Sequence, residues 1–253
     1  MAEVLVVGMP KLHVRMSAAA TLHCPGCQHP TIERIVAELL EEMDIWVDTI
    51  GVFGVGCGTR FFHSVRVDAV QAAHGRACDV ATGVKRGLLG KPFVFTLQGD
   101  GDAIAIGAGG LIGAAGRGEK ITVIMVNNAN YGTTGGQMAP TTLMKQITTT
   151  SPYGRDSNAG YPIHVAELLT QLKGVAFSAR GSLTSPANYR RTKEYIKIAF
   201  EKQLNNVGFS FVEILAACPT NWHMSPVESL KWIDEQMSVE FPLGEYKNVN
   251  SID

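Results

Sequence analysis

One stretch of the sequence decides the fold, and it reads FVFTLQGDGDAIAIGAGGLIGAAGRGEKITVIMVNN over residues 93–128. Residues 93–97 form a run of apolar side chains typical of a buried strand, and residues 121–126 have the same character. Between them, residues 103–117 are predicted to form a helix of small residues after a tight loop at residues 99–102. This order predicts a parallel βαβ crossover, whose ligands bind beyond the carboxyl ends of the strands.

The same alternation of strands and helices continues on both sides of this unit. We predict helices at residues 32–43, 70–88, 165–172 and 187–204, and strands at residues 4–7, 50–55, 175–179 and 209–215. A loop over residues 127–161 is too long to be a mere connector, which indicates a functional role. The pattern predicts an α/β domain over residues 1–224, with a largely parallel sheet covered by helices, and a C-terminal helix and tail over residues 225–253.

The composition is that of a globular protein without an unusual partner. The 253 residues are 45% apolar and 18% charged, with 27 glycines and 11 prolines, which excludes disorder as the main state. The net charge of -1 comes with no basic stripe, so we expect no binding to nucleic acid or to a membrane. The longest apolar run, residues 103–116, is too short and too rich in glycine to span a bilayer, and no signal peptide is evident. We therefore expect a cytoplasmic protein.

The motif Gly99-Asp100-Gly101 is one crossover away from Asn127-Asn128. Because the carboxyl ends of neighbouring parallel strands share one edge of the sheet, we expect Asp100 and Asn128 to meet there. Their side-chain oxygens and the backbone carbonyl of Asn130 are hard ligands, which suit a divalent cation that holds a diphosphate. The flanking glycines let the main chain approach the phosphates, and a helix N-terminus attracts them. The spacing resembles the diphosphate fingerprint of thiamine diphosphate enzymes.

Four of the five cysteines, Cys24, Cys27, Cys57 and Cys218, lie in predicted loops. An odd number of cysteines in a chain of this length argues against a secreted disulfide scaffold and favours metal or redox chemistry. Four separated thiolates can hold a [4Fe-4S] cluster if the fold gathers them. A structural zinc ion and ordinary buried thiols are the alternatives. Cys78 falls in a predicted helix, where we expect a small core residue.

Several short motifs occur in order between residues 22 and 220. They are Cys24-Pro25-Gly26-Cys27, Gly54-Val55-Gly56-Cys57, His74-Gly75-Arg76-Ala77, Gly99-Asp100-Gly101-Asp102, Asn127-Asn128, Tyr131-Gly132, Thr134-Gly135-Gly136-Gln137 and Pro140-Thr141-Thr142. Together they resemble the β subunit of 2-oxoacid:ferredoxin oxidoreductases. Among these enzymes, the motifs are most similar to those of the branched-chain (2-oxoisovalerate) and 2-oxoglutarate types.

The resemblance implies the pyrophosphate-binding domain of the thiamine diphosphate-binding fold. It implies that Asp100, Asn128 and the Asn130 carbonyl hold Mg²⁺, and that Cys24, Cys27, Cys57 and Cys218 ligate one [4Fe-4S] cluster. The residues that it places at thiamine diphosphate, besides the magnesium ligands, are Val55, Gly56, Cys57, Gly58, His74, Gly99, Gly101, Asp102, Gly132, Thr133, Thr134, Gly135, Gly136 and Gln137. Arg60 and Thr133 are candidate substrate contacts, and no other catalytic side chain is assigned.

The resemblance also implies an activity that needs partners. The reaction is the coenzyme A-dependent oxidative decarboxylation of a 2-oxo acid to acyl-CoA and CO₂, with electrons passing through the cluster to ferredoxin. The implied partners are an α subunit with the pyrimidine-binding domain, a γ domain or subunit, and a ferredoxin-like subunit. We therefore expect the chain alone to be inactive.

Two other functions remain open from the residues. The first is a subunit of a non-redox thiamine diphosphate decarboxylase or carboligase, in which the cysteines are incidental. The second is a zinc-stabilised α/β binding module without catalysis, in which Gly-Asp-Gly and Asn-Asn are only turns.

Overall fold

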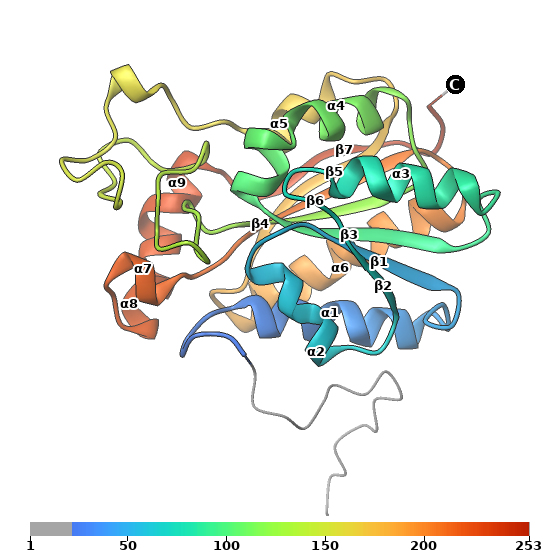
Figure 1. Ribbon diagram of the computed structural model, residues 1–253, viewed down its shortest axis with the longest axis horizontal. Helices are drawn as coiled ribbons and strands as arrows, with labels where there is room; N and C mark the ends of the chain where they lie inside the picture. The colour runs from blue at the N-terminus through green and yellow to red at the C-terminus, as the bar shows by residue number, and fades with distance from the viewer. Residues whose placement is uncertain (1–21, 253) are drawn as a thin grey trace, which may run out of the picture.

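The computed structural model of the protein describes residues 22–252, and the strand predicted at residues 4–7 lies outside them. The described residues form one seven-stranded sheet with helices on both faces (Figure 1). The strands are β1 (Thr49–Phe53), β2 (Asp68–Gln71), β3 (Phe93–Gly99), β4 (Thr122–Asn127), β5 (Val175–Ser182), β6 (Phe209–Leu215) and β7 (Gly244–Asn248). The longer helices are α1 (His29–Glu42), α3 (Ala77–Gly87), α4 (Ala108–Gly116) and α6 (Pro186–Leu204). The shorter helical segments are η1 (Cys57–Arg60), α2 (Phe61–Ser64), η2 (Gly101–Ile106), η3 (Ser157–Ala159), α5 (Val165–Thr170), α7 (Pro219–Trp222), α8 (Pro226–Trp232), η4 (Ile233–Met237) and α9 (Ser238–Glu240).

The order of strands in the sheet determines where the functional loops meet. The order is β2-β1-β3-β4-β6-β5-β7, and every pair is parallel except β5 with β7. The strands β1, β3, β4 and β6 are therefore consecutive neighbours that all point the same way. The segments that follow them share one edge of the sheet, the place where open α/β sheets bind ligands.

Each face of the sheet is buried against its own set of helices. Alternate residues of β3 illustrate this, because Phe93 and Phe95 belong to the apolar cluster with α1 and α6, whereas Val94 belongs to the cluster with α3, α4 and α5. Figure 1 shows these two helical layers on opposite sides of the sheet. Helix α6 begins where Ser185 caps it by accepting a hydrogen bond from the Asn188 amide, followed at once by Pro186.

The predicted crossover is confirmed, with differences in its detail. Strands β3 and β4 are parallel neighbours, joined by η2 and α4. The expected tight loop at residues 99–102 is wrong, because Gly99 ends β3 and Asp100 caps the N-terminus of the π-helical segment η2. The single helix predicted at residues 103–117 is divided into η2 and α4. The chain therefore passes from strand to helix without a loop, which places backbone amides directly at the sheet edge.

One other element differs from prediction. Residues 70–71 belong to β2 and not to a helix. Gly75 adopts a left-handed φ of 75°, and α3 begins only at Ala77. The strand predicted at residues 209–215 is found as β6 with these bounds, and Cys218 lies beyond it at the N-cap position of α7. The other helices and strands predicted within the described residues are found, with shifted ends.

The segment after Ser225 contains more than the predicted helix and tail. It forms α8, η4 and α9, and then β7 pairs antiparallel with β5 as an edge strand. The proposed division of the chain at this point stays a prediction. None of the helices within residues 22–252 has the length and apolar character needed to cross a bilayer.

The core beneath α6 yields a prediction for stability. The Phe200 ring is fully buried, with its centroid 4.7 Å from that of Phe93. We expect Phe200→Ala to lower the free energy of unfolding by about 3–5 kcal/mol in urea denaturation, because it leaves a cavity in this core. The matched control is Leu204→Ala in the same helix, where the side chain is 43% exposed and the loss should be below about 1 kcal/mol. Equal losses in the two variants would contradict this description of the core.

Candidate active site

A cavity of about 310 Å³ opens at the carboxyl ends of the central strands. Thirteen of its lining residues were predicted to bind the cofactor: Val55, Gly56, Cys57, His74, Gly99, Asp100, Gly101, Asp102, Asn128, Asn130, Gly132, Thr133 and Thr134. The predicted residues Gly58, Gly135, Gly136 and Gln137 do not line it. Two lining residues, His29 and Tyr131, were not predicted to bind the cofactor. The segments after β1, β3 and β4 therefore converge as their motifs indicated.

This cavity is called the larger cavity below, because a second one of about 110 Å³ adjoins it. Gly135, Gly136 and Gln137 close a loop beside the larger cavity. Gly135 and Gly136 adopt positive φ angles of 111° and 79°, and Tyr131 exchanges backbone hydrogen bonds with Gln137 and Gly136. Gly58 is buried, and a Cβ at this position would lie 3.3 Å from the Leu97 carbonyl oxygen. These glycines shape the backbone around the cavity.

Asp100 is buried at the floor of the larger cavity, with 1% of its surface exposed. Its Oδ1 accepts a hydrogen bond from the Gly101 amide at 2.8 Å, and its Oδ2 accepts one from the Thr141 hydroxyl at 2.5 Å. Burial raises the pKa of this carboxyl from 3.8 to about 7, although both hydrogen bonds act in the opposite direction. A cation beside Asp100 would offset the cost of its buried charge.

Two further buried oxygens belong to residues that line the same cavity as Asp100. The Oδ1 atoms of Asn128 and Asn130 are buried, and neither has a hydrogen-bond partner within the described residues. The Nδ2 of Asn130 donates to the Asn128 carbonyl at 3.0 Å, which fixes the turn between them. Buried polar atoms are nearly always paired, so unpaired oxygens beside a buried carboxylate fit a hard cation such as Mg²⁺.

Asp102 joins the three segments that line one side of the larger cavity. Its carboxylate accepts hydrogen bonds from the amides of Val55 and Gly75 and from Nε2 of Gln98. The Nδ1 of His74 lies 2.7 Å from the same carboxylate. The Asp102 side chain, which was predicted to contact the cofactor, thus accepts its hydrogen bonds from the protein itself and holds these segments in place.

The glycine at position 101 is required by a close approach. A Cβ built there would lie 2.1 Å from the Tyr131 ring, whose hydroxyl is 3.5 Å from the Gly101 carbonyl oxygen. Tyr131 therefore covers the N-terminus of η2 and confines the larger cavity. Its place in the motif Tyr131-Gly132 was the available sequence signal.

A second cavity of about 110 Å³ gathers the four predicted cysteines. Burial raises the pKa of the Cys27 thiol from 9.0 to about 12, and the neighbouring thiols of Cys57, Cys218 and Cys24 add to this increase. Cys78 lies elsewhere, buried in α3, where its Sγ donates to Gln98 Oε1. The fold thus brings together the residues expected to ligate a cluster and leaves the fifth cysteine in the core.

Three cysteine sulfurs in this cysteine cavity contact polar side chains. The distances are 3.3 Å from Cys27 Sγ to His29 Nδ1, 3.0 Å from Cys57 Sγ to Thr133 Oγ1, and 3.4 Å from Cys218 Sγ to Asn221 Nδ2. Such contacts stabilise thiolates and tune the potential of a metal–sulfur centre. Arg60 also lines the cysteine cavity and not the larger one, whereas Thr133 lines both.

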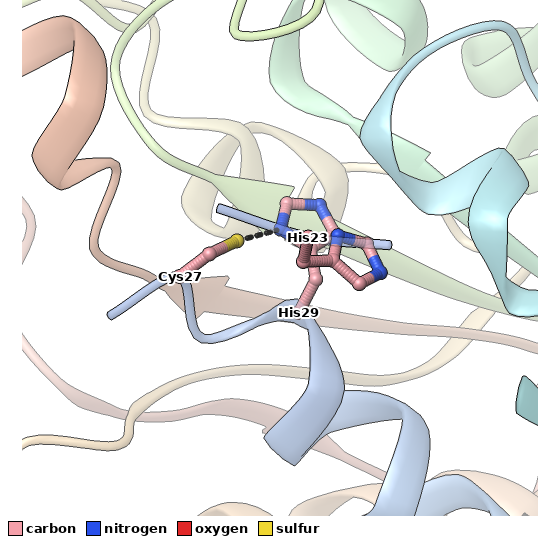
Figure 2. Close-up of side chains that lie close together, drawn as sticks. All are labelled: His23, Cys27 and His29. Carbon is pink, nitrogen blue, oxygen red and sulfur yellow. Dashed lines mark hydrogen bonds between the residues drawn. The ribbon is translucent and has the colours of Figure 1, made fainter. Parts of the chain in front are cut away.

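Two histidines that were not predicted from the sequence flank Cys27. Ligand atoms of His23, Cys27 and His29 all lie within 4.8 Å of one another, and the two imidazole rings stack (Figure 2). His23 Nε2 bonds the buried Glu33 at 2.8 Å, and burial lowers the pKa of His29 from 6.5 to about 3. The signal that could have found them is their position beside the Cys-x-x-Cys motif.

The two cavities share a wall, which we define as His29, Cys57, Asn128, Gly132 and Thr133. These five residues come from α1, η1 and the loop after β4. The shared wall contains one of the four gathered cysteines and one of the two asparagines with an unpaired oxygen. A ligand in the larger cavity would therefore lie next to a metal centre in the cysteine cavity.

Known proteins share both the sequence and the fold. Residues 52–214 match the family model described as the thiamine pyrophosphate enzyme, C-terminal TPP binding domain. The chain is 34% identical over 225 residues to the 2-oxoglutarate synthase subunit KorB of Archaeoglobus fulgidus, covering 88% of this chain and 79% of that one. The chain belongs to the 2-oxoacid:ferredoxin oxidoreductase family. The resemblance read from the motifs is thereby confirmed.

Two further relatives extend this result. The ketoisovalerate oxidoreductase subunit VorA of Methanothermobacter marburgensis is 41% identical over 233 residues, which cover 92% of this chain and 48% of VorA. This chain therefore spans about half the length of that relative. The solved structure of a 2-oxoglutarate:ferredoxin oxidoreductase from Magnetococcus marinus, with 2-oxoglutarate, coenzyme A and succinyl-CoA bound, superposes with a TM-score of 0.78 at 25% identity. That match covers 94% of this chain and 84% of the other.

The hydrogen bonds of Asp102 yield a prediction for the site. Asp102→Ala leaves the amides of Val55 and Gly75 without their acceptor, so we expect the free energy of unfolding to fall by roughly 1–3 kcal/mol. Asp79→Ala is the control, because Asp79 pairs with Arg76 at the surface and should contribute less than about 1 kcal/mol. Hydrogen exchange at Val55 and Gly75 should accelerate only in the Asp102 variant; unchanged exchange there would refute the role of Asp102.

Proposed function

We propose that the chain is the subunit of a 2-oxoacid:ferredoxin oxidoreductase that binds the diphosphate of thiamine diphosphate and a [4Fe-4S] cluster. The enzyme would convert a 2-oxo acid, coenzyme A and oxidised ferredoxin to acyl-CoA, CO₂ and reduced ferredoxin. The observation that carries the proposal is the shared wall, because a cavity suited to thiamine diphosphate adjoins a cavity lined by four cysteines. Electron transfer between two such groups requires this proximity.

Mg²⁺ fits the oxygens at the floor of the larger cavity. Asp100 supplies a buried carboxylate, and Asn128 supplies a buried amide oxygen without a partner. The Asn130 backbone carbonyl stays the proposed third ligand. The start of η2 after Asp100 adds backbone amides that favour an anionic diphosphate.

The two proposed cofactors divide the chemistry between them. Bound thiamine diphosphate would supply a nucleophilic carbon for the ketone of the substrate and a positively charged ring that accepts the electrons released with CO₂, and a bound cluster would take up electrons one at a time. The residues of this chain hold the diphosphate, exclude water from the larger cavity and keep the cysteine cavity adjacent. Arg60 and Thr133 are proposed to contact the substrate, Arg60 through the substrate carboxylate.

The substrate and partners follow from the relatives. Because one relative is named a ketoisovalerate and another a 2-oxoglutarate enzyme, we propose a 2-oxo acid of one of these two types. Both relatives are named as subunits, so we propose assembly with an α subunit that carries the pyrimidine-binding domain, a γ domain or subunit, and a ferredoxin-like subunit. The protein would pass its electrons to ferredoxin.

The buried Asp100 gives the first test. Since its pKa is higher in the folded chain than its ordinary value of 3.8, the folded state loses stability as pH rises from about 4 through 7. We expect Asp100→Asn, which cannot ionise, to raise the melting temperature of the cofactor-free chain at pH 8. The same variant should lose the stabilisation that Mg²⁺ and thiamine diphosphate give the unaltered chain. A variant that keeps this stabilisation would contradict the proposed magnesium site.

Metal content gives the second test. The anaerobically purified full chain should contain about four iron and four sulfide per chain, with an electron paramagnetic resonance signal after reduction. Cys57→Ser should lose the iron, whereas the control Cys78→Ala should keep it, because Cys78 lies in α3 outside the cysteine cavity. Zinc without iron would support the zinc-stabilised module, for which His23, Cys27 and His29 provide the donors. Cofactor binding without either metal would support the non-redox enzyme.

A further inference from the structure

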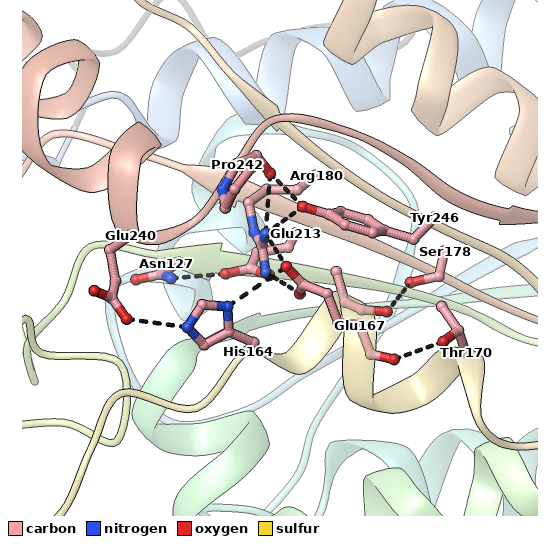
Figure 3. A network of polar contacts seen from close by, with 11 residues as sticks. Asn127, His164, Glu167, Thr170, Ser178, Arg180, Glu213, Glu240, Pro242 and Tyr246 are labelled. Carbon is pink, nitrogen blue, oxygen red and sulfur yellow. Dashed lines mark hydrogen bonds and ion pairs between the residues drawn. The ribbon is translucent and has the colours of Figure 1, made fainter.

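A buried ion pair joins β5 and β6, next to β4. The loop that follows β4 carries the proposed magnesium ligands Asn128 and Asn130. Arg180 of β5 and Glu213 of β6 are opposite each other in register, and both side chains are fully buried (Figure 3). The distance from Arg180 Nε to Glu213 Oε2 is 2.9 Å. Glu167 and the Tyr246 hydroxyl accept hydrogen bonds from the remaining guanidinium nitrogens, so the orientation of Arg180 is fixed from several sides.

The second oxygen of Glu213 points along the sheet to the end of β4. Its Oε1 accepts a hydrogen bond from Asn127 Nδ2 at 2.7 Å, and Asn127 Oδ1 in turn accepts one from the Ala129 amide at 3.1 Å. Figure 3 shows the contact between Asn127 and Glu213. Three side chains from three neighbouring strands thus form one continuous series of hydrogen bonds that ends on the backbone between Asn128 and Asn130.

The backbone at the end of this series is held in an uncommon conformation. Ala129 has a positive φ of 54°, a region that residues with a Cβ rarely adopt without support. The Thr142 hydroxyl holds its carbonyl at 2.7 Å, and Asn127 holds its amide. This turn lies between the two proposed ligands Asn128 and Asn130, which both line the larger cavity, so its geometry determines where their oxygens lie.

Apolar side chains of similar volume often stabilise a core as well as a buried ion pair does, so stability alone does not explain this pair. We propose that Asn127 and Glu213, oriented by Arg180, are positioning residues for the divalent cation that binds at Asp100 and Asn128. The inference rests on the proposed function, and it assigns these side chains a role in cation affinity. None of the three residues lines the cavity that contains Asp100 and Asn128.

The experiment measures binding of Mn²⁺, in the presence of thiamine diphosphate, to the full chain by electron paramagnetic resonance of the free ion. We expect Asn127→Ala to weaken Mn²⁺ binding about 10- to 100-fold, because it removes the side chain that holds the Ala129 amide, as with other residues that orient metal ligands. The matched control is Thr122→Val at the opposite end of β4, which removes a buried hydrogen bond to Gln203 and should leave affinity unchanged.

A second variant separates positioning from stability. Arg180→Met combined with Glu213→Leu replaces the ion pair by apolar side chains and should remain folded by circular dichroism. It should nevertheless bind Mn²⁺ more weakly, because Asn127 loses its acceptor. Affinity within twofold of the unaltered chain in a folded variant would overturn the inference. If the unaltered chain itself failed to bind Mn²⁺ with thiamine diphosphate, the proposed function would fail instead.

Discussion

The parallel pairing of β1, β3, β4 and β6 is the constraint on which the rest of the structure depends. Parallel neighbours end at the same edge, so four chain segments that are far apart in sequence begin there. Those segments carry Cys57, Asp100, Asn128 and Cys218. A change in strand order would separate the oxygens from the thiols without altering any motif.

The site is built from features that lower stability, and the core must compensate for them. Asp100 is a buried carboxylate with a raised pKa, two asparagine oxygens lack partners, and Ala129 has a left-handed backbone. The two apolar clusters, one on each face of the sheet, provide the rigid support. At the site, each of these unfavourable features lies where a ligand would complete it, as expected of a functional site.

Local patterns predicted the parts of the fold that depend on local sequence. The crossover between β3 and β4 could be predicted because its apolar runs and small-residue helix lie next to one another in the chain. The helix predicted from residue 70 failed because an exposed edge strand such as β2 has no apolar run, and Gly75 was not recognised as a helix stop. Strand β7 was missed for the same reason, since it is short, polar and placed by pairing with β5.

The site was predicted in its motifs but not in its surroundings. Asp100 and Asn128 were found because glycines and sheet topology constrain them, whereas His29 and Tyr131 stand beside recognised motifs but reach the larger cavity through tertiary packing. The contact between Arg180 and Glu213 could not be predicted from the sequence. Each is a charged residue in a mostly apolar strand, and only the order and register of the strands bring the two together. Such contacts depend on the pairing of strands that are distant in the sequence, and not on local sequence preferences.

The position of Cys57 in the shared wall has a consequence for sensitivity to air. Its sulfur is 3.4 Å from the place where a Cβ on Gly132 would lie, it contacts Thr133, and the residue lines both cavities. Oxidation of a thiol to a sulfenic acid adds an oxygen atom and a new polar group. At Cys57 that oxygen would enter the boundary of both cavities at once. Exposure to oxygen would therefore damage the binding of an organic cofactor together with the metal centre, and restoring iron alone would not repair the protein.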